Sequence, residues 1–291
     1  MIRLLSVLVM MGAVSACSTA QHASDWNAWV DKTNASYTTD KNAVLKVRDA
    51  VYLKPGETAW LVGSESLSVL QPASRSSASI VFESAEPGAE AVSVNLSGEE
   101  PREFGSRLDD IELTDGDFIN GGLSGFGTDD PRYAVFLYDA DHPKAAGFEG
   151  LNFFPYDPAY RVEAVIDAKP EFKPVLLQTE RGLVKQFFDV GTARFTMNGV
   201  EAELPLMSTA SESGKLDYLF FTFMDDTTGI ETYNIGRYLD VPLETGELPE
   251  TLILDFNYAY NPLCSRSPHF NCPLVETVIP MAVRAGEKYT Y

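Results

Sequence analysis

In this 291-residue chain, the polar residues best suited to bind a ligand or to catalyse a reaction lie close together in the C-terminal part, among aromatic residues. Aromatic faces beside amides, hydroxyls and carboxylates form the kind of pocket that binds a sugar or another polar small molecule. The sequence therefore predicts a site for a polar small molecule, a glycan or a peptide. Its candidate ligand-binding residues are Asp225, Thr228, Glu231, Tyr233, Arg237, Asp255, Asn257, Tyr260 and Asn261.

One charged pair within this group follows from a strand pattern. Residues 252–257 alternate so that leucine and phenylalanine side chains share one face of a strand, while Asp255 and Asn257 lie on the other. A partly buried carboxylate needs an opposite charge or several donors. We expect Arg237 to bind Asp255, because a guanidinium donates two parallel hydrogen bonds to a carboxylate. The same residues also suit a purely structural polar network, and the sequence leaves both interpretations open.

Catalysis is a second hypothesis, although the chain carries no Gly-x-Ser-x-Gly, His-Glu-x-x-His, P-loop or dinucleotide-binding motif. A serine triad would need His142 or His269, and both lie beside prolines in predicted loops. A hydrolase would instead need two carboxylates facing one cleft, drawn from Asp225, Glu231 and Asp255. A third hypothesis is a structural or assembly factor. We assign no catalytic residue and expect no cofactor.

The C-terminal part of the chain contains a series of short motifs in a fixed order. Asp225 begins a D-x-T-x-G-x-E-T-Y segment, Arg237 an R-[FY]-L step, Asp255 a D-F-N-x-A-Y-N-P-x-C segment and Cys272 a C-P pair, and an A-G-E-K segment closes the series. This pattern resembles the bacterial domain-of-unknown-function family DUF1684, whose members are often lipoproteins. The likeness is close over residues 220–288 and diffuse elsewhere. It departs from the family pattern after Pro273, where Leu-Val-Glu-Thr replaces a proline-rich continuation. The resemblance implies no activity.

The N-terminus has the features of an export signal. Arg3 precedes the apolar run 4–11, and Val-Ser-Ala leads directly into Cys17. This arrangement resembles the lipobox of bacterial lipoproteins, which implies cleavage before Cys17 and acylation of that cysteine. Two or three acyl chains anchor a protein stably to a membrane. Because Ser18 is not aspartate, we expect the periplasmic face of the outer membrane, and without lipidation a periplasmic protein.

Two cysteines remain in the mature chain besides Cys17. In an oxidising compartment the expected state of Cys264 and Cys272 is a disulfide. A zinc site is the rival interpretation, but His269 is the single further ligand between them. The acidic segment 109–117 raises the question of a bound cation, yet its spacing does not match an EF-hand loop, and it also suits a solvated strand edge.

The charge of the chain excludes one class of partner. Lysine and arginine number 22 against 42 acidic residues, and cleavage before Cys17 would remove Arg3 and leave 21. Such an anionic surface repels phosphate backbones and favours cations and basic partners. We therefore expect no nucleic acid partner, a membrane contact through the lipid at Cys17, and a ligand that is a polar small molecule or glycan.

The elements that must position these residues are mostly strands. After a short helix predicted to begin at Ser24, short segments rich in valine, threonine and aromatic residues alternate with turn residues. Asn198-Gly199 predicts a two-residue hairpin. The expected fold is mainly β, with two antiparallel β units of sandwich or barrel-like form. The predicted organisation is a signal peptide at 1–16, a lipidated tether at 17–24, an N-terminal β domain at 25–146 and a C-terminal β domain at 147–291.

Overall fold

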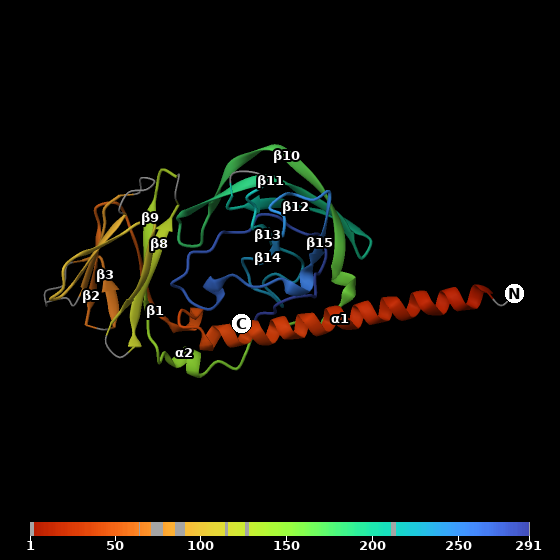
Figure 1. Ribbon diagram of the computed structural model, residues 1–291, viewed down its shortest axis with the longest axis horizontal. Coiled ribbons are helices and arrows are strands. Elements are labelled where there is room, and N and C mark those ends of the chain that lie inside the picture. Colours follow the sequence, from red (N-terminus) through yellow and green to blue (C-terminus); the bar gives the residue numbers. More distant parts are fainter. Residues whose placement is uncertain are drawn as a thin grey trace.

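A computed structural model describes residues 3–63, 65–70, 78–84, 91–113, 116–125, 128–210 and 214–290, with side chains from residue 19 onward. The fold is mainly β and its sheets are antiparallel, as the sequence predicts (Figure 1). The strands of residues 47–138 form two sheets, and the strands of residues 161–255 form a third. The boundary predicted after residue 146 falls between these two groups of strands.

The N-terminal unit is a sandwich of a four-stranded and a five-stranded sheet. The first sheet has the order β1-β9-β8-β7 and the second the order β3-β2-β4-β5-β6. Buried side chains of both sheets form one core, in which Phe82 packs against Tyr133. The strands are β1 (Val47–Leu53), β2 (Thr58–Val62), β3 (Ser66–Ser68), β4 (Ala78–Phe82), β5 (Val92–Leu96), β6 (Arg102–Phe104), β7 (Arg107–Glu112), β8 (Phe118–Ser124) and β9 (Arg132–Tyr138).

The C-terminal unit is a strongly curved six-stranded sheet of order β14-β13-β12-β11-β10-β15 (Figure 1). Asn198 and Gly199 both have positive φ and join β11 to β12, which confirms the predicted hairpin. Residues 256–290 carry no strand, and among them Ile279 and Val283 are buried against the inner face. The strands are β10 (Arg161–Gln178), β11 (Val184–Met197), β12 (Val200–Ser208), β13 (Tyr218–Phe223), β14 (Arg237–Pro242) and β15 (Thr251–Asp255).

The N-terminal helix α1 (Arg3–Thr39) is longer than the sequence predicts. It includes residues 18–24, for which we expected a polar tether; these residues contain neither glycine nor proline to end a helix. Trp26 fixes the helix to the C-terminal unit, because its indole N–H donates to the carbonyl of Asn257 at 2.8 Å. The other end of α1 extends past the body of the molecule (Figure 1). Within the described residues, no helix is both long enough and apolar enough to cross a membrane.

Short helices complete the connections. His142 caps α2 (Pro143–Ala146) by accepting the backbone N–H of Lys144, so this histidine has a structural role. The remaining short helices are η1 (Val44–Lys46), η3 (Pro158–Tyr160), η4 (Phe256–Tyr258) and η5 (Leu263–Ser265).

Candidate functional site

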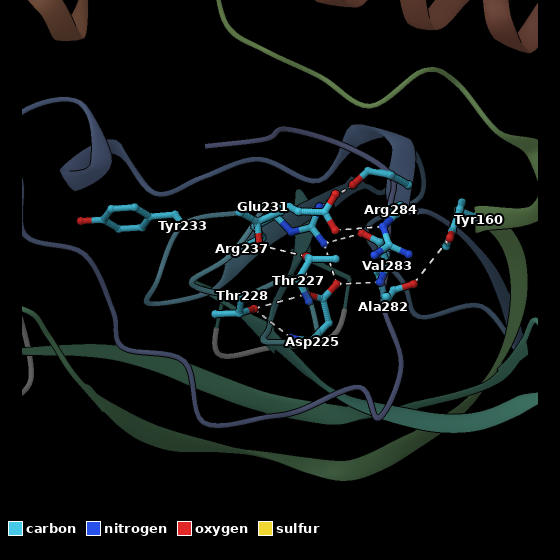
Figure 2. Close-up of polar contacts among 12 residues, drawn as sticks. Tyr160, Asp225, Thr227, Thr228, Glu231, Tyr233, Arg237, Ala282, Val283 and Arg284 are labelled. Carbon is cyan, nitrogen blue, oxygen red and sulfur yellow. Dashed lines mark hydrogen bonds and ion pairs between the residues drawn. The ribbon is translucent and has the colours of Figure 1, made fainter. Parts of the chain in front are cut away.

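Arg237 forms a fully buried ion pair with Asp225, not with Asp255 (Figure 2). Its guanidinium donates to Asp225 Oδ2 at 2.7 Å and to the carbonyl of Val283 at 2.8 Å. The predicted pairing with Asp255 is wrong because strand order overrides the sequence pattern. Arg237 begins β14 at one edge of the sheet and Asp255 ends β15 at the other, where Arg161 lies 3.6 Å away.

Asp225 closes the turn that follows β13. Its Oδ1 accepts the backbone N–H of Thr227 at 2.9 Å and the hydroxyl of the same residue at 2.6 Å, while Oδ2 accepts the N–H of Val283 at 2.9 Å. The hydroxyl of Thr228 accepts the backbone N–H of Asp225 at 3.0 Å (Figure 2). The polar groups of the D-x-T-x-G segment are therefore used in internal hydrogen bonds. These bonds hold the last strands and the C-terminal segment together.

The remaining members of the predicted site are also bonded internally. Asn257 accepts the N–H of Asp157 and donates to its carbonyl, both at 2.9 Å, and it donates to Asp255 at 2.8 Å. Burial raises the pKa of Asp255. Asn261 receives the backbone N–H of Tyr233 at 3.4 Å and donates to Lys288 at 3.0 Å.

Two predicted residues lie near the surface. Glu231 forms an ion pair with Arg284 at 2.9 Å (Figure 2). The ring of Tyr233 contacts that of Tyr289, with centroids 4.9 Å apart. Of the nine predicted ligand-binding residues, Tyr260 alone lines the cavity described next. The structure therefore brings most of the predicted residues together as a polar network and not as an open site.

A cavity of about 860 Å³ lies between the two β units. This volume is within the range of small-molecule sites. The N-terminal unit contributes Tyr52, Leu123, Ser124, Gly125, Ala134 and Phe136. The C-terminal unit contributes Lys185, Gln186, Phe187, Phe188, Thr209, Tyr218, Phe220, Tyr238, Asp240, Tyr260, Leu263, Phe270, Asn271, Cys272 and Pro273.

A row of aromatic rings from the six-stranded sheet forms one wall of this cavity. Phe187 on β11 stacks on Phe220 of β13, with ring centroids 5.0 Å apart. Phe220 meets Tyr238 of β14 edge to face at 4.9 Å, and Tyr238 meets Tyr260 in the same way at 5.9 Å. This face of the sheet is opposite the main core, and its rings belong to a second apolar cluster that borders the cavity.

Asp240 is a carboxylate on this aromatic wall. The hydroxyl of Tyr260 donates to its Oδ2 at 2.7 Å. Surrounding protein raises the pKa of Asp240 by desolvation, although its side chain reaches solvent through the cavity, and it also raises the pKa of Tyr260. A raised pKa in the folded state means that the charged form of Asp240 lowers stability above the ordinary carboxyl pKa. Such a cost is typical of functional positions.

Asn271 and Lys185 are the other polar groups of note in the cavity wall. Asn271 is 4% exposed, and neither atom of its amide group has a hydrogen-bond partner within the described chain. A buried polar group without a partner costs about 1–3 kcal/mol. Burial lowers the pKa of Lys185. No sequence motif marks Asn271 or Asp240; the available signal for Asp240 is its position two residues after Tyr238 on one face of a strand.

Cys264 and Cys272 are free thiols that lie in contact. The backbone N–H of Cys264 donates to Cys272 Sγ at 3.1 Å, and a hydrogen bond from the Cys264 thiol lowers the pKa of Cys272. The disulfide remains a prediction, which this proximity favours.

His269, the further ligand considered for a zinc site, lies 3.8 Å from Asp49. Among the residues that the structure describes, no group of three or more histidine, cysteine or acidic side chains is arranged to hold a metal ion.

The acidic segment 109–117 is largely matched by basic side chains. Lys41 bonds Asp110 at 2.7 Å and Glu112 at 2.5 Å, and Arg48 bonds Asp117 at 3.1 Å. Asp115 lies outside the described residues. These ion pairs give the described carboxylates a structural role at the edge of the sandwich.

Comparison with known proteins identifies one family and no activity. The model of a family described as "Protein of unknown function (DUF1684)" matches residues 146–288. A solution NMR structure of an uncharacterised protein from Haloarcula marismortui is 33% identical; the match covers 50% of this chain and 80% of that one, with a TM-score of 0.42. Among curated proteins no match was found.

Proposed function

This chain belongs to the DUF1684 family of proteins of unknown function, and we propose that it binds a polar small molecule in the cavity between its two β units. The observation that carries the proposal is the unpartnered amide of Asn271, which is buried in a wall otherwise rich in aromatic side chains. Small-molecule sites combine apolar walls with a few oriented polar groups. The proposed site thus lies on the opposite face of β14 from Arg237 and shares only Tyr260 with the residues predicted from the sequence.

Binding is favoured over hydrolysis by the distribution of carboxylates. Asp225 is buried against Arg237, Glu231 pairs with Arg284, and Asp255 lies beside Arg161. Of the described residues that line the cavity, Asp240 is the one carboxylate. A single carboxylate does not provide the acid and base pair of a glycosidase.

The neutral fluorescent probe N-phenyl-1-naphthylamine is expected to bind the cavity with an increase in its fluorescence. Thr209 is exposed and lines the cavity, so Thr209→Trp fills part of it without touching the core. We expect this variant to bind the probe at least about tenfold more weakly. The matched control is Thr196→Trp, since Thr196 is exposed on β11 and does not line the cavity. Equal weakening by both variants contradicts the proposed site.

We further propose that the chain is an envelope lipoprotein held by acyl chains on Cys17. The support is the export signal and the lipobox-like Val-Ser-Ala-Cys sequence. Cys17→Ser is expected to move the protein from the membrane fraction to the soluble fraction, and Ser18→Asp to move it from the outer to the inner membrane. Mass spectrometry of the N-terminal peptide reads the modification directly. An unmodified cysteine behind an intact leader would refute this assignment.

A further inference from the structure

Asp240 is framed by four aromatic side chains that belong to three segments of the chain. Phe220 on β13 lies directly opposite Asp240, and side chains paired in this way are about 5 Å apart on the same face. Tyr238 precedes Asp240 by two residues on β14 and shares that face. Tyr260 lies on the other side of β14, where it exchanges two backbone hydrogen bonds of 2.9 Å with Tyr238. Tyr218, diagonal to Asp240 across β13, completes the frame.

No basic side chain of the described residues neutralises this carboxylate. Its hydrogen-bond donor is the neutral hydroxyl of Tyr260. The cationic side chain in the cavity wall is Lys185, which is on β11. In the strand order β14-β13-β12-β11, that strand is three positions from Asp240, or about 14 Å at 4.8 Å per strand. The charge of Asp240 is therefore available to a ligand.

We propose that the ligand carries an organic cation, an ammonium or quaternary ammonium group, which Asp240 and its four aromatic neighbours hold. This inference rests on the proposed function, since it names the chemistry of the ligand in the same cavity. A cation over aromatic faces is attracted by their electron-rich surfaces, and a carboxylate beside them adds a direct charge contact. The acidic excess of the whole chain attracts cations to the site.

The test compares choline with 3,3-dimethyl-1-butanol, in which a carbon atom replaces the quaternary nitrogen. Isothermal titration calorimetry is expected to give at least about tenfold tighter binding for choline. Asp240→Asn should remove that preference because it removes the charge and keeps the shape. Asp217→Asn is the matched control: it removes an equal charge from an exposed residue near β13 that does not line the cavity, and the preference for choline should persist.

The outcomes separate this inference from the proposed function. Equal affinity for choline and its neutral analogue, or a preference that survives Asp240→Asn, overturns the organic cation. Absence of choline binding does the same if N-phenyl-1-naphthylamine still binds the cavity, and the proposed function then stands. Failure of both probes removes the binding function itself.

Discussion

Replacing Asp225 by asparagine is expected to lower the free energy of unfolding by about 3–5 kcal/mol, because it leaves the Arg237 guanidinium buried without an opposite charge. Desolvation already lowers the pKa of Arg237, and Asp225 is the group that most favours its charged form. The substitution also weakens the bonds that Asp225 accepts from Thr227 and Val283. Urea denaturation followed by circular dichroism measures the effect.

The neighbouring residue supplies the control for this prediction. Asp226 is exposed, so Asp226→Asn should change the free energy of unfolding by no more than about 0.5 kcal/mol. A double variant, Asp225→Leu with Arg237→Met, removes both charges. The loss in free energy of unfolding for this double variant should be smaller, by at least about 1 kcal/mol, than the sum of the losses for Asp225→Leu and Arg237→Met alone, because the two groups interact directly. Additive costs would mean that the ion pair contributes little to stability.

Gly286→Ala should destabilise the protein by about 3 kcal/mol or more. Gly286 has φ of +77°, and a non-glycine residue in this conformation costs roughly 1–2 kcal/mol. A β-carbon here would also overlap the carbonyl oxygen of Ala259 and lie 2.8 Å from that of Phe256. Forcing atoms into such a packed place adds about 1–3 kcal/mol.

Gly229 separates the two contributions to that cost. It has the same φ of +77°, but a β-carbon added to it meets nothing within 4 Å. Gly229→Ala should therefore cost only the conformational part, about 1–2 kcal/mol, in the same thermal or urea unfolding assay. Equal effects of the two substitutions would show that close packing around Gly286 is unimportant. The A-G-E-K segment would then need another explanation than the approach of its backbone to Ala259.

Much of the fold could be predicted from local patterns. The alternation in residues 252–257 correctly indicates that Leu254 and Phe256 are buried, and both are 0% exposed. The predicted strand is too long, because β15 ends at Asp255 and Phe256 begins η4. The Asn198-Gly199 turn was predictable because positive φ at two successive positions is a local property of those residues. The partner of Arg237 was not predictable in this way. It depends on which strands are neighbours in the sheet, and periodicity along one strand carries no such information.

The cavity was beyond the reach of sequence patterns for a related reason. Its wall joins Tyr52 and Phe136 of the N-terminal unit to Phe220 and Asn271 of the C-terminal unit, so it exists only once the two units pack. The density of polar residues instead favours a site around Asp225. The dense polar residues of this turn form the hydrogen bonds that stabilise the turn itself. A single carboxylate among aromatic side chains, such as Asp240, does not form a recognisable local motif.

The continuous helix α1 changes what an acyl anchor would do. From Cys17 to Trp26 the helix rises about 14 Å, and Trp26 is fixed to the C-terminal unit. Because no flexible segment would separate the lipid from the folded body, an acylated Cys17 would connect the two through a rigid helix. The protein would stand at a set height and in a set orientation above the bilayer, so that the mouth of its cavity always opens toward the same side of the periplasmic space.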